Sequence, residues 1–97
     1  MAAYVIVSYD ITDPKAYEPY VPGVMPLITK HAGEIVVGEF AAKPLEGEPH
    51  GVYVVLKFPS EQAARAWHED PEYQPLKAIR FATCKNNNMV IANPAGG

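Results

Sequence analysis

The side chains best suited to hold a metal ion or act as a nucleophile in this 97-residue chain are three histidines and one cysteine. His31, His50 and His68 are far apart, and no two have the i, i+4 spacing with which a helix presents a pair of zinc ligands. The single thiol, Cys84, excludes an internal disulfide and any site with two cysteine ligands. Lys85 beside it would favour the thiolate, but no partner base accompanies it. We therefore expect no metal site and no cofactor, a structural Cys84, and His31 and His68 at the surface.

Three residues are candidates for acid–base catalysis: Asp10, His50 and Arg80. A half-buried Asp10 would have a raised pKa and could act as a general base. His50 precedes a predicted strand in a long loop, from which it could line a pocket. Arg80 is suited to bind the carboxylate of an acidic substrate, or to complement a helix C-terminus. The alternative for Asp10 is a solvated edge or a salt-bridged dimer seam.

Four aromatic residues could form a pocket for a small planar ligand. Tyr17 and Tyr20 belong to the first predicted helix, and Trp67 and Tyr73 lie in or near the second. Aromatic residues at helical spacing also occur as ordinary core residues, so this pattern supports two interpretations, a ligand site and a packed core.

Four segments have the composition of β-strands: residues 3–11, 34–40, 52–58 and 89–92. In the first, Val5, Val7, Tyr9 and Ile11 alternate with a second set that becomes polar, so we expect the first set to face the core. In the segment 34–40, strict alternation places Ile35 and Val37 together on one face. A long polar connection over residues 41–51 separates this strand from the next.

Helices are predicted between these strands. Asp13 and Pro14 form a helix start, and an apolar stripe continues to residue 28. Because Pro19, Pro22 and Pro26 interrupt it, we expect a kinked or broken helix that ends at Gly33 in a left-handed conformation. Ser60 caps a helix over residues 61–69, and Asp70-Pro71 predicts a further helix over residues 71–82.

The predicted order β-α-β-β-α-β indicates an α+β fold of the ferredoxin-like type, with a four-stranded antiparallel sheet and both helices on one face. Residues 1–97 are long enough for a single domain. Two helices cannot cover both faces of a sheet, and Tyr4 and Ile6 remain on the open face. A second subunit stacking its sheet there is the natural partner, so we expect a homodimer.

Composition excludes several classes of function. Eight basic against eleven acidic residues leave a formal charge of −3, and without a basic run we expect no nucleic-acid binding. Gly33, Gly38 and Gly47 do not form a phosphate-binding loop. The apolar runs are far shorter than the ~20 residues of a membrane-spanning helix, and no signal-peptide pattern opens the chain, so we expect a soluble, cytoplasmic protein without membrane contact.

Three segments resemble one protein family. They are the opening AYVIVSYDITDPKAY, the stretch LKFPS-x-x-x-A-x-x-W over residues 56–67, and DPEYQPLKAIR over residues 70–80. Together they resemble the family named domain of unknown function 1330. The resemblance implies the dimeric α/β-barrel fold, in a superfamily that includes cofactor-free monooxygenases and muconolactone isomerases with sites between the sheet and the helices. The chain differs from the common pattern at Gly38, where arginine is frequent, and at Lys57.

We therefore hold three hypotheses. The leading one is a homodimer that binds a small organic molecule, with Tyr17, Tyr20, Trp67 and Tyr73 as ligand contacts. The alternative is a cofactor-independent monooxygenase- or isomerase-like enzyme in which Asp10 or His50 removes a proton and Arg80 holds an acidic substrate. That enzyme would need a closed cavity of roughly 300 Å³ or more with convergent polar groups. The third is a structural or regulatory dimer without a pocket.

Overall fold

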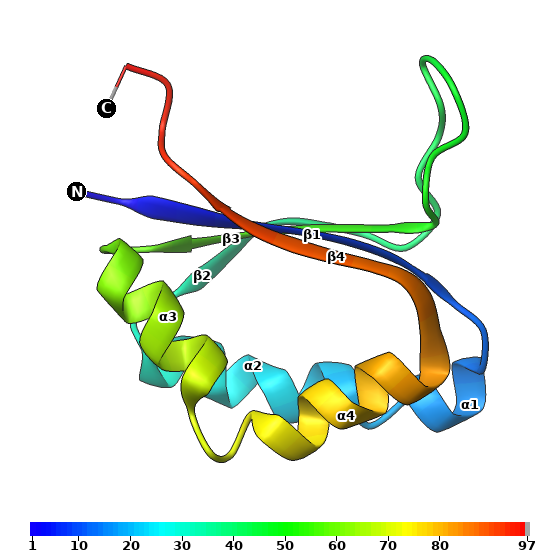
Figure 1. Ribbon diagram of the computed structural model, residues 1–97, viewed down its shortest axis with the longest axis horizontal. Coiled ribbons are helices and arrows are strands. Elements are labelled where there is room, and N and C mark those ends of the chain that lie inside the picture. Colours follow the sequence, from blue (N-terminus) through cyan, green and yellow to red (C-terminus); the bar gives the residue numbers. More distant parts are fainter. Residues whose placement is uncertain (97) are drawn as a thin grey trace.

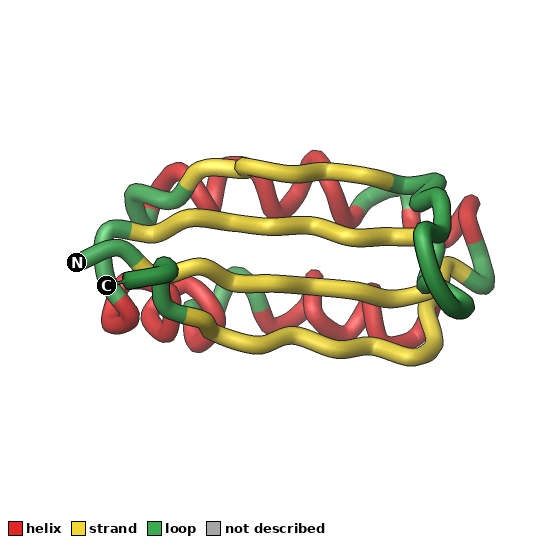
Figure 2. The backbone as a smooth tube through the Cα atoms, turned by 90° about the horizontal axis from the view of Figure 1, so that it is seen from above, coloured by secondary structure: helices red, strands yellow, loops and turns green. Residues whose placement is uncertain are grey.

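Residues 1–96 are described in a computed structural model, and they form two layers, a sheet and the helices beneath it (Figure 1). The strands are β1 (Ala3–Ile11), β2 (Glu34–Glu39), β3 (Val52–Phe58) and β4 (Cys84–Ala92). The helices are α1 (Pro14–Tyr17), α2 (Tyr20–Lys30), α3 (Glu61–Glu69) and α4 (Gln74–Thr83). The sheet is antiparallel in the order β2-β3-β1-β4, and all the helices lie on one of its faces (Figure 2). This is the predicted ferredoxin-like α+β fold.

The core lies between the two layers. Val5, Val7 and Tyr9 of β1 are buried, as the alternation predicts, and they pack with the buried stripe of α2 that includes Val24 and Leu27. The other face of the sheet carries no helix, so the molecule is a slab with extents of 35 × 34 × 16 Å.

The predicted alternation of β2 is wrong because this strand contains a β-bulge. Ile35 is opposite Leu56 of β3, but Val37 rather than Val36 is opposite the next residue, Val55. The additional residue shifts every later side chain of β2 to the other face. Val37 therefore lies on the open face and not beside Ile35, and Gly38 takes the place beneath the sheet.

The last strand is longer than predicted. Its first half contains Asn86, Asn87 and Asn88, which have low strand propensity. Asn86 adopts a left-handed backbone conformation with φ of 57°, next to an irregularity in the pairing of β4 with β1 between Ser8 and Asp10. Asparagine tolerates this conformation better than most residues, so the asparagines accommodate a bulge within the strand rather than end it.

The helix after β1 is broken at Pro19, as predicted, whereas Pro22 and Pro26 lie inside the continuous helix α2 and do not interrupt it. Asp13 caps α1 by accepting a hydrogen bond from the amide of Ala16, and the chain restarts as α2 at Tyr20. The left-handed residue after α2 is Ala32, with φ of 62°, and not Gly33. Glycine is needed at position 33 for space, because a Cβ there would lie 2.6 Å from the ring of Phe58.

The final helix starts later than predicted, at Gln74 rather than Pro71. A start at Pro71 would put Pro75 inside the helix, where its missing N–H breaks a hydrogen bond, whereas a start at Gln74 keeps Pro75 in the first turn. Residues 71–73 instead form a turn that Asp70 stabilises by accepting a hydrogen bond from the amide of Glu72.

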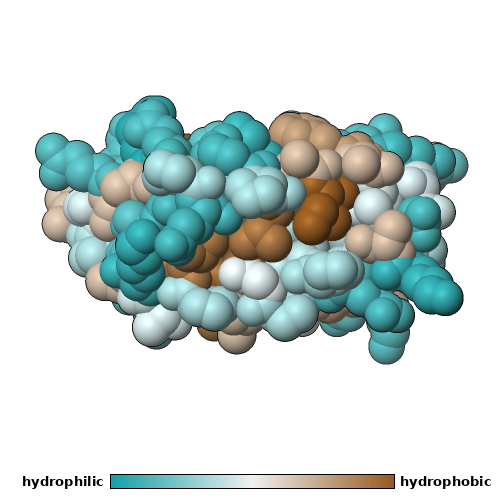
Figure 3. All heavy atoms as spheres, turned by 90° about the horizontal axis from the view of Figure 1, so that it is seen from below, coloured by the Kyte–Doolittle hydropathy of each residue, from teal (hydrophilic) through white to brown (hydrophobic). Residues whose placement is uncertain are grey.

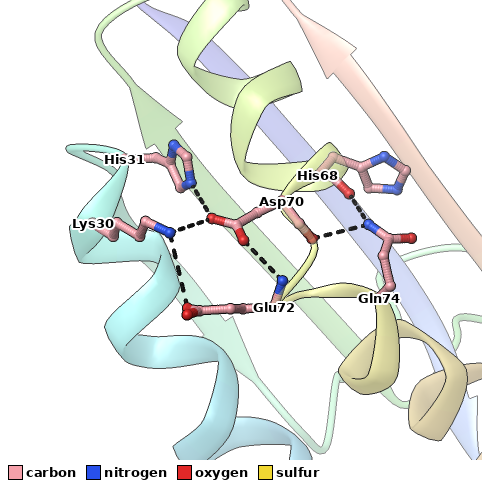
Figure 4. A network of polar contacts seen from close by, with 6 residues as sticks. All are labelled: Lys30, His31, His68, Asp70, Glu72 and Gln74. Carbon is pink, nitrogen blue, oxygen red and sulfur yellow. Dashed lines mark hydrogen bonds and ion pairs between the residues drawn. The ribbon is translucent and has the colours of Figure 1, made fainter.

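Asp70 also joins this turn to the end of α2 (Figure 4). Its Oδ2 accepts hydrogen bonds from Lys30 Nζ and His31 Nε2, both at 2.8 Å. The Lys30 ammonium first, then His31 and the amide of Glu72, hold the pKa of the Asp70 carboxyl well below its usual range. His31 is thus a bonded, partly buried residue rather than the surface histidine we expected.

Apolar side chains are also present at the surface. From the helix side, apolar atoms form a band across the middle of the face, surrounded by polar atoms (Figure 3). On the open face of the sheet, four apolar residues stand side by side, one on each strand: Val37, Val55, Ile6 and Val90. None of the helices in residues 1–96 has the length and hydropathy to span a bilayer.

Candidate functional site

A cavity of about 90 Å³ lies between the sheet and α2. Its lining is almost entirely apolar and aromatic. The sheet contributes Val7, Tyr9, Ile35, Gly38, Phe40, Val54, Leu56 and Met89, and the helices contribute Tyr17, Tyr20, Val21, Val24, Met25, Ile28 and Trp67. Its volume is below the roughly 300 Å³ that the enzyme hypothesis needs, and below the ~150 Å³ of an apolar cavity that admits benzene.

Gly38 is the reason that this space is open near β2. It lies on the helix side of the strand because of the bulge, opposite Val54. A Cβ built on it would meet one atom within 4 Å, Ile35 Cγ2 at 3.7 Å. Any larger residue here would project into the cavity. The neighbouring Met25, Ile35 and Phe40 are all partly exposed, which places the mouth of the cavity between α2 and the edge strand β2.

Two pairs of tyrosine hydroxyls lie at the inner side of the cavity. The Tyr9 and Tyr17 hydroxyls form one hydrogen bond, and the Tyr20 and Tyr73 hydroxyls form another of 2.8 Å. Burial, followed by the interaction with Tyr17, raises the pKa of Tyr9 well above its usual value, and burial and Tyr73 do the same for Tyr20. Both therefore remain protonated near neutral pH and can donate a hydrogen bond.

Arg80 is buried behind these tyrosines, with 2% of its surface exposed. Its Nη1 donates to Asn87 Oδ1 at 2.8 Å, and its Cζ lies 5.9 Å from the centre of the Tyr9 ring. It also interacts with the hydroxyls of Tyr20 and Tyr73. Its Nε has no hydrogen-bond partner in residues 1–96.

Trp67 closes another part of the wall and has 1% of its surface exposed. Its ring packs 4.6 Å from that of Tyr73 and 5.6 Å from that of Phe58, measured between centroids. The helical periodicity of α3 places Trp67 and Ala64, three residues apart, on the same buried face of the helix. Its indole Nε1 is also without a hydrogen-bond partner in the described chain.

Asp10 and His50 meet on the opposite, open side of the sheet. His50 Nδ1 lies 2.9 Å from Asp10 Oδ2, which also accepts a bond from Asn86 Nδ2, and the amide of Gly51 donates to Oδ1 at 2.8 Å. The Asn86 bond first, then Gly51 and His50, lower the pKa of Asp10 to about 2. The expected raised pKa is therefore wrong, and Asp10 is a weak base. A hydrogen bond from Nδ1–H leaves His50 Nε2 as the proton acceptor of this pair.

The structure brings some of the predicted site residues together and separates others. Tyr17, Tyr20 and Trp67 line the cavity, and Tyr73 and Arg80 lie directly behind it. Asp10 and His50 are on the other side of the sheet, so the three catalytic candidates do not converge on one space. Lys57 stands opposite Tyr4 on β1, far along the strand from Asp10.

The remaining reactive residues have structural environments. Burial raises the pKa of the Cys84 thiol, contrary to the activation that Lys85 would favour. Burial, then Lys77 and Arg80, lower the pKa of His68, which favours the neutral imidazole, and this partly buried residue is not the surface histidine we expected. Residues 1–96 contain no cluster of three or more histidine, cysteine or carboxylate side chains placed to hold a metal ion.

Sequence reasoning did not identify Gly38, Asn86 and Asn87 as site residues. Gly38 opens the cavity, Asn86 holds Asp10, and Asn87 holds Arg80. One signal was present: asparagine is enriched in the left-handed conformation that Asn86 adopts beside the bulge.

Comparison with known proteins agrees with this geometry. One family model matches residues 2–94, and its description is "Domain of unknown function (DUF1330)". No curated protein sequence matches the chain.

Solved structures show the same fold at low sequence identity. A protein of unknown function from Rhodopseudomonas palustris has a TM-score of 0.82 at 17% identity, with 96% of this chain and 82% of that chain covered. A dimeric ferredoxin-like protein from Jannaschia sp. CCS1 has a TM-score of 0.80 at 16% identity, with 97% and 100% covered. SnoaB, a cofactor-independent oxygenase from Streptomyces nogalater, has a TM-score of 0.67 at 13% identity, with 96% and 92% covered.

Proposed function

The chain belongs to the DUF1330 family, and from that premise and the geometry above we propose that it is a homodimer that binds one small organic molecule in the cavity of each subunit. The observation that carries the proposal is the apolar space beneath Gly38, which the core could have filled at no cost to the backbone. Gly38 does not have a positive φ, so its backbone does not require glycine, and glycine within a strand often marks a bulge or a site that a ligand approaches closely.

The open face of the sheet supports the homodimer. Its central row of Val37, Val55, Ile6 and Val90 is flanked by a polar row that contains Ser8 and Asn88. The loop over residues 41–51 and the chain after β4 rise beyond this face at opposite ends of the sheet (Figure 1). A second sheet fits between them, and stacked sheets bury such faces about 10 Å apart. Several structures with this fold are described as dimeric.

Binding is favoured over the catalytic alternative because of where the candidate groups lie. Asp10 and His50 are separated by the sheet from Arg80 and from the cavity, so no single bound molecule within a subunit reaches all three. SnoaB is described as an oxygenase that needs no cofactor, but the likeness at 13% identity extends to the fold alone.

The proposal is tested with a variant that fills the cavity. Gly38→Leu places a side chain in the space without backbone strain, and Ala41→Leu adds the same side chain at an exposed position three residues later. Xenon and isobutyramide serve as neutral probes, the first small enough to enter completely and the second with its alkyl end at the mouth of the cavity, and amide chemical shifts report binding.

We expect the parent protein and Ala41→Leu to bind both probes, with the largest shifts in β2 and α2, and Gly38→Leu to bind neither. We also expect Gly38→Leu to be more stable by about 0.5–2 kcal/mol, as is common for cavity-filling substitutions. Equal binding by all three proteins would exclude this cavity as the site. Native mass spectrometry of the parent protein tests the dimer, and a subunit mass alone would contradict it.

A further inference from the structure

The wall between the cavity and Arg80 contains hydrogen-bond donors that have no acceptor among the described residues. Each of the four tyrosine hydroxyls has one proton. The bond between Tyr9 and Tyr17 uses one proton of that pair, and the bond between Tyr20 and Tyr73 uses one of the other. One O–H of each pair therefore has no acceptor among the hydrogen bonds of residues 1–96.

Two nitrogen donors add to this excess. Trp67 Nε1 and Arg80 Nε are both buried and without partners in the described residues. Trp67 and three of the tyrosines line the cavity itself. A buried donor without an acceptor costs about 1–3 kcal/mol, and most buried polar groups in proteins have partners. Unused donors at the wall of the cavity, with that of Arg80 behind them, indicate that an acceptor-rich group belongs there.

The positive charge of Arg80 also favours an acceptor-rich group in this region. Arg80 is cationic at all physiological pH values, and none of the ion pairs within residues 1–96 includes it. Its neighbours are neutral: the amide of Asn87, the rings of Tyr9 and Phe81, and the hydroxyls of Tyr20 and Tyr73. A buried cation without a counter-ion is unfavourable, so an anion bound nearby would be stabilised.

Resting on the proposed function, we propose that the ligand is a small organic carboxylate, with its apolar part in the cavity and its two oxygens at the tyrosine hydroxyls. The carboxylate accepts the unused O–H bonds of Tyr17 and Tyr20, and Arg80 strengthens both interactions from behind the rings. Arg80 is then a positioning residue, because the tyrosines separate it from the cavity. By comparison with the ~150 Å³ cavity that admits benzene, the volume of about 90 Å³ holds only about four non-hydrogen atoms, so a short carboxylate fits with its alkyl end at the mouth of the cavity.

Isobutyrate and isobutyramide test this directly, since they have the same shape and differ in charge. We measure both dissociation constants by amide chemical shifts at pH 7 and constant ionic strength. In the parent protein we expect isobutyrate to bind at least tenfold more tightly than isobutyramide. Gly38→Leu should lose both ligands, and Ala41→Leu should keep both.

Two further variants examine the donors. Tyr17→Phe removes one hydroxyl, and Arg80→Gln removes the charge but keeps a polar side chain; circular dichroism establishes that each is folded. In both we expect the ratio of the two affinities to fall at least threefold while isobutyramide binding changes little. Should Arg80→Gln fail to fold, Tyr17→Phe alone decides.

The outcomes separate the two proposals. Equal affinity for isobutyrate and isobutyramide in the parent protein would overturn the carboxylate assignment and leave the cavity as a binding site. Absence of binding by either probe would overturn both proposals. Isobutyrate binding that survives Gly38→Leu would place the carboxylate elsewhere and overturn the assignment.

Discussion

The imidazole of His50 lies 2.9 Å from the carboxylate of Asp10 and connects the base of the long loop to the end of β1. The backbone amide of Gly51 donates to the same carboxylate. Asp10 is therefore the anchor of the segment that rises above the open face, and its charge state affects how that segment is held.

Acid should weaken this anchor in a defined range. The pKa of Asp10 is lowered from about 3.8 to about 2 by Asn86, then Gly51 and His50. The pKa of Asp10 is lower in the folded protein than in the unfolded chain. The ionised carboxylate therefore stabilises the fold fully above about pH 4, and this stabilisation is lost as the pH falls to about 2. The side-chain carbonyl shift of Asp10 in a titration should give the low value, and Asn86→Ala should move it back toward 3.8. A midpoint near 4 in the parent protein would contradict the contacts.

The Asp70 network predicts an uneven response to two acidic substitutions. Asp70→Asn should lower the melting temperature, because it removes the charge that binds Lys30 and His31. Glu72→Gln should have little effect, since Glu72 is exposed and lies 3.9 Å from Lys30. The difference in melting temperature between Asp70→Asn and the parent protein should shrink in acid. Because the pKa of Asp70 is lowered in the folded protein, its contribution to stability is lost only as the pH falls below the usual carboxyl range. Equal effects of the two substitutions would argue against the network.

Two neighbouring substitutions after α2 should have opposite signs. Gly33→Ala forces a Cβ to 2.6 Å from Phe58 and 2.9 Å from Ile28, and overpacking of this kind costs about 1–3 kcal/mol. Ala32→Gly relieves a left-handed alanine, which should stabilise the protein by up to about 1 kcal/mol. Urea denaturation measures both. Stabilisation by Gly33→Ala would show that the glycine is not needed for space.

A charge in the middle of the open face should dissociate the dimer. Ile6 is 39% exposed in the single chain and stands between Val55 and Val90. Ile6→Lys introduces a charge from each subunit into the proposed interface, whose burial is unfavourable without a partner. Native mass spectrometry and sedimentation should show a monomer, whereas Ala66→Lys on the exposed side of α3 should leave the dimer intact. A dimeric Ile6→Lys protein would mean that another surface pairs the subunits.

Local patterns in the sequence were sufficient for most of the fold. Three features depend on residues close together in the chain, and the structure confirms each of them: the alternation in β1, the cap at Ser60 and the helix break at Pro19. The split β-α-β order followed from these elements and the short connections between them.

What sequence reasoning missed depends on contacts between distant segments. The bulge in β2 is defined by pairing with β3, and the requirement for glycine at position 33 comes from Phe58, 25 positions later. The aromatic residues of the predicted pocket lie close together, and three of them line the cavity. The sheet that separates Arg80 from Asp10 and His50 could not be inferred from spacing alone. The pKa of Asp10 could not be predicted for the same reason, because it depends on hydrogen bonds from His50 in the loop and Asn86 in β4.

The bulge at Val36 has a consequence for how this protein can change. One additional residue turns Gly38 toward the helices and Val37 toward the open face. If β2 paired with β3 without the bulge, Val37 would lie opposite Val54 and enter the cavity, and Val36 would take its place in the apolar row on the outside. The hollow interior therefore depends on one additional residue in one edge strand, whereas the surface proposed for pairing keeps a valine in either register.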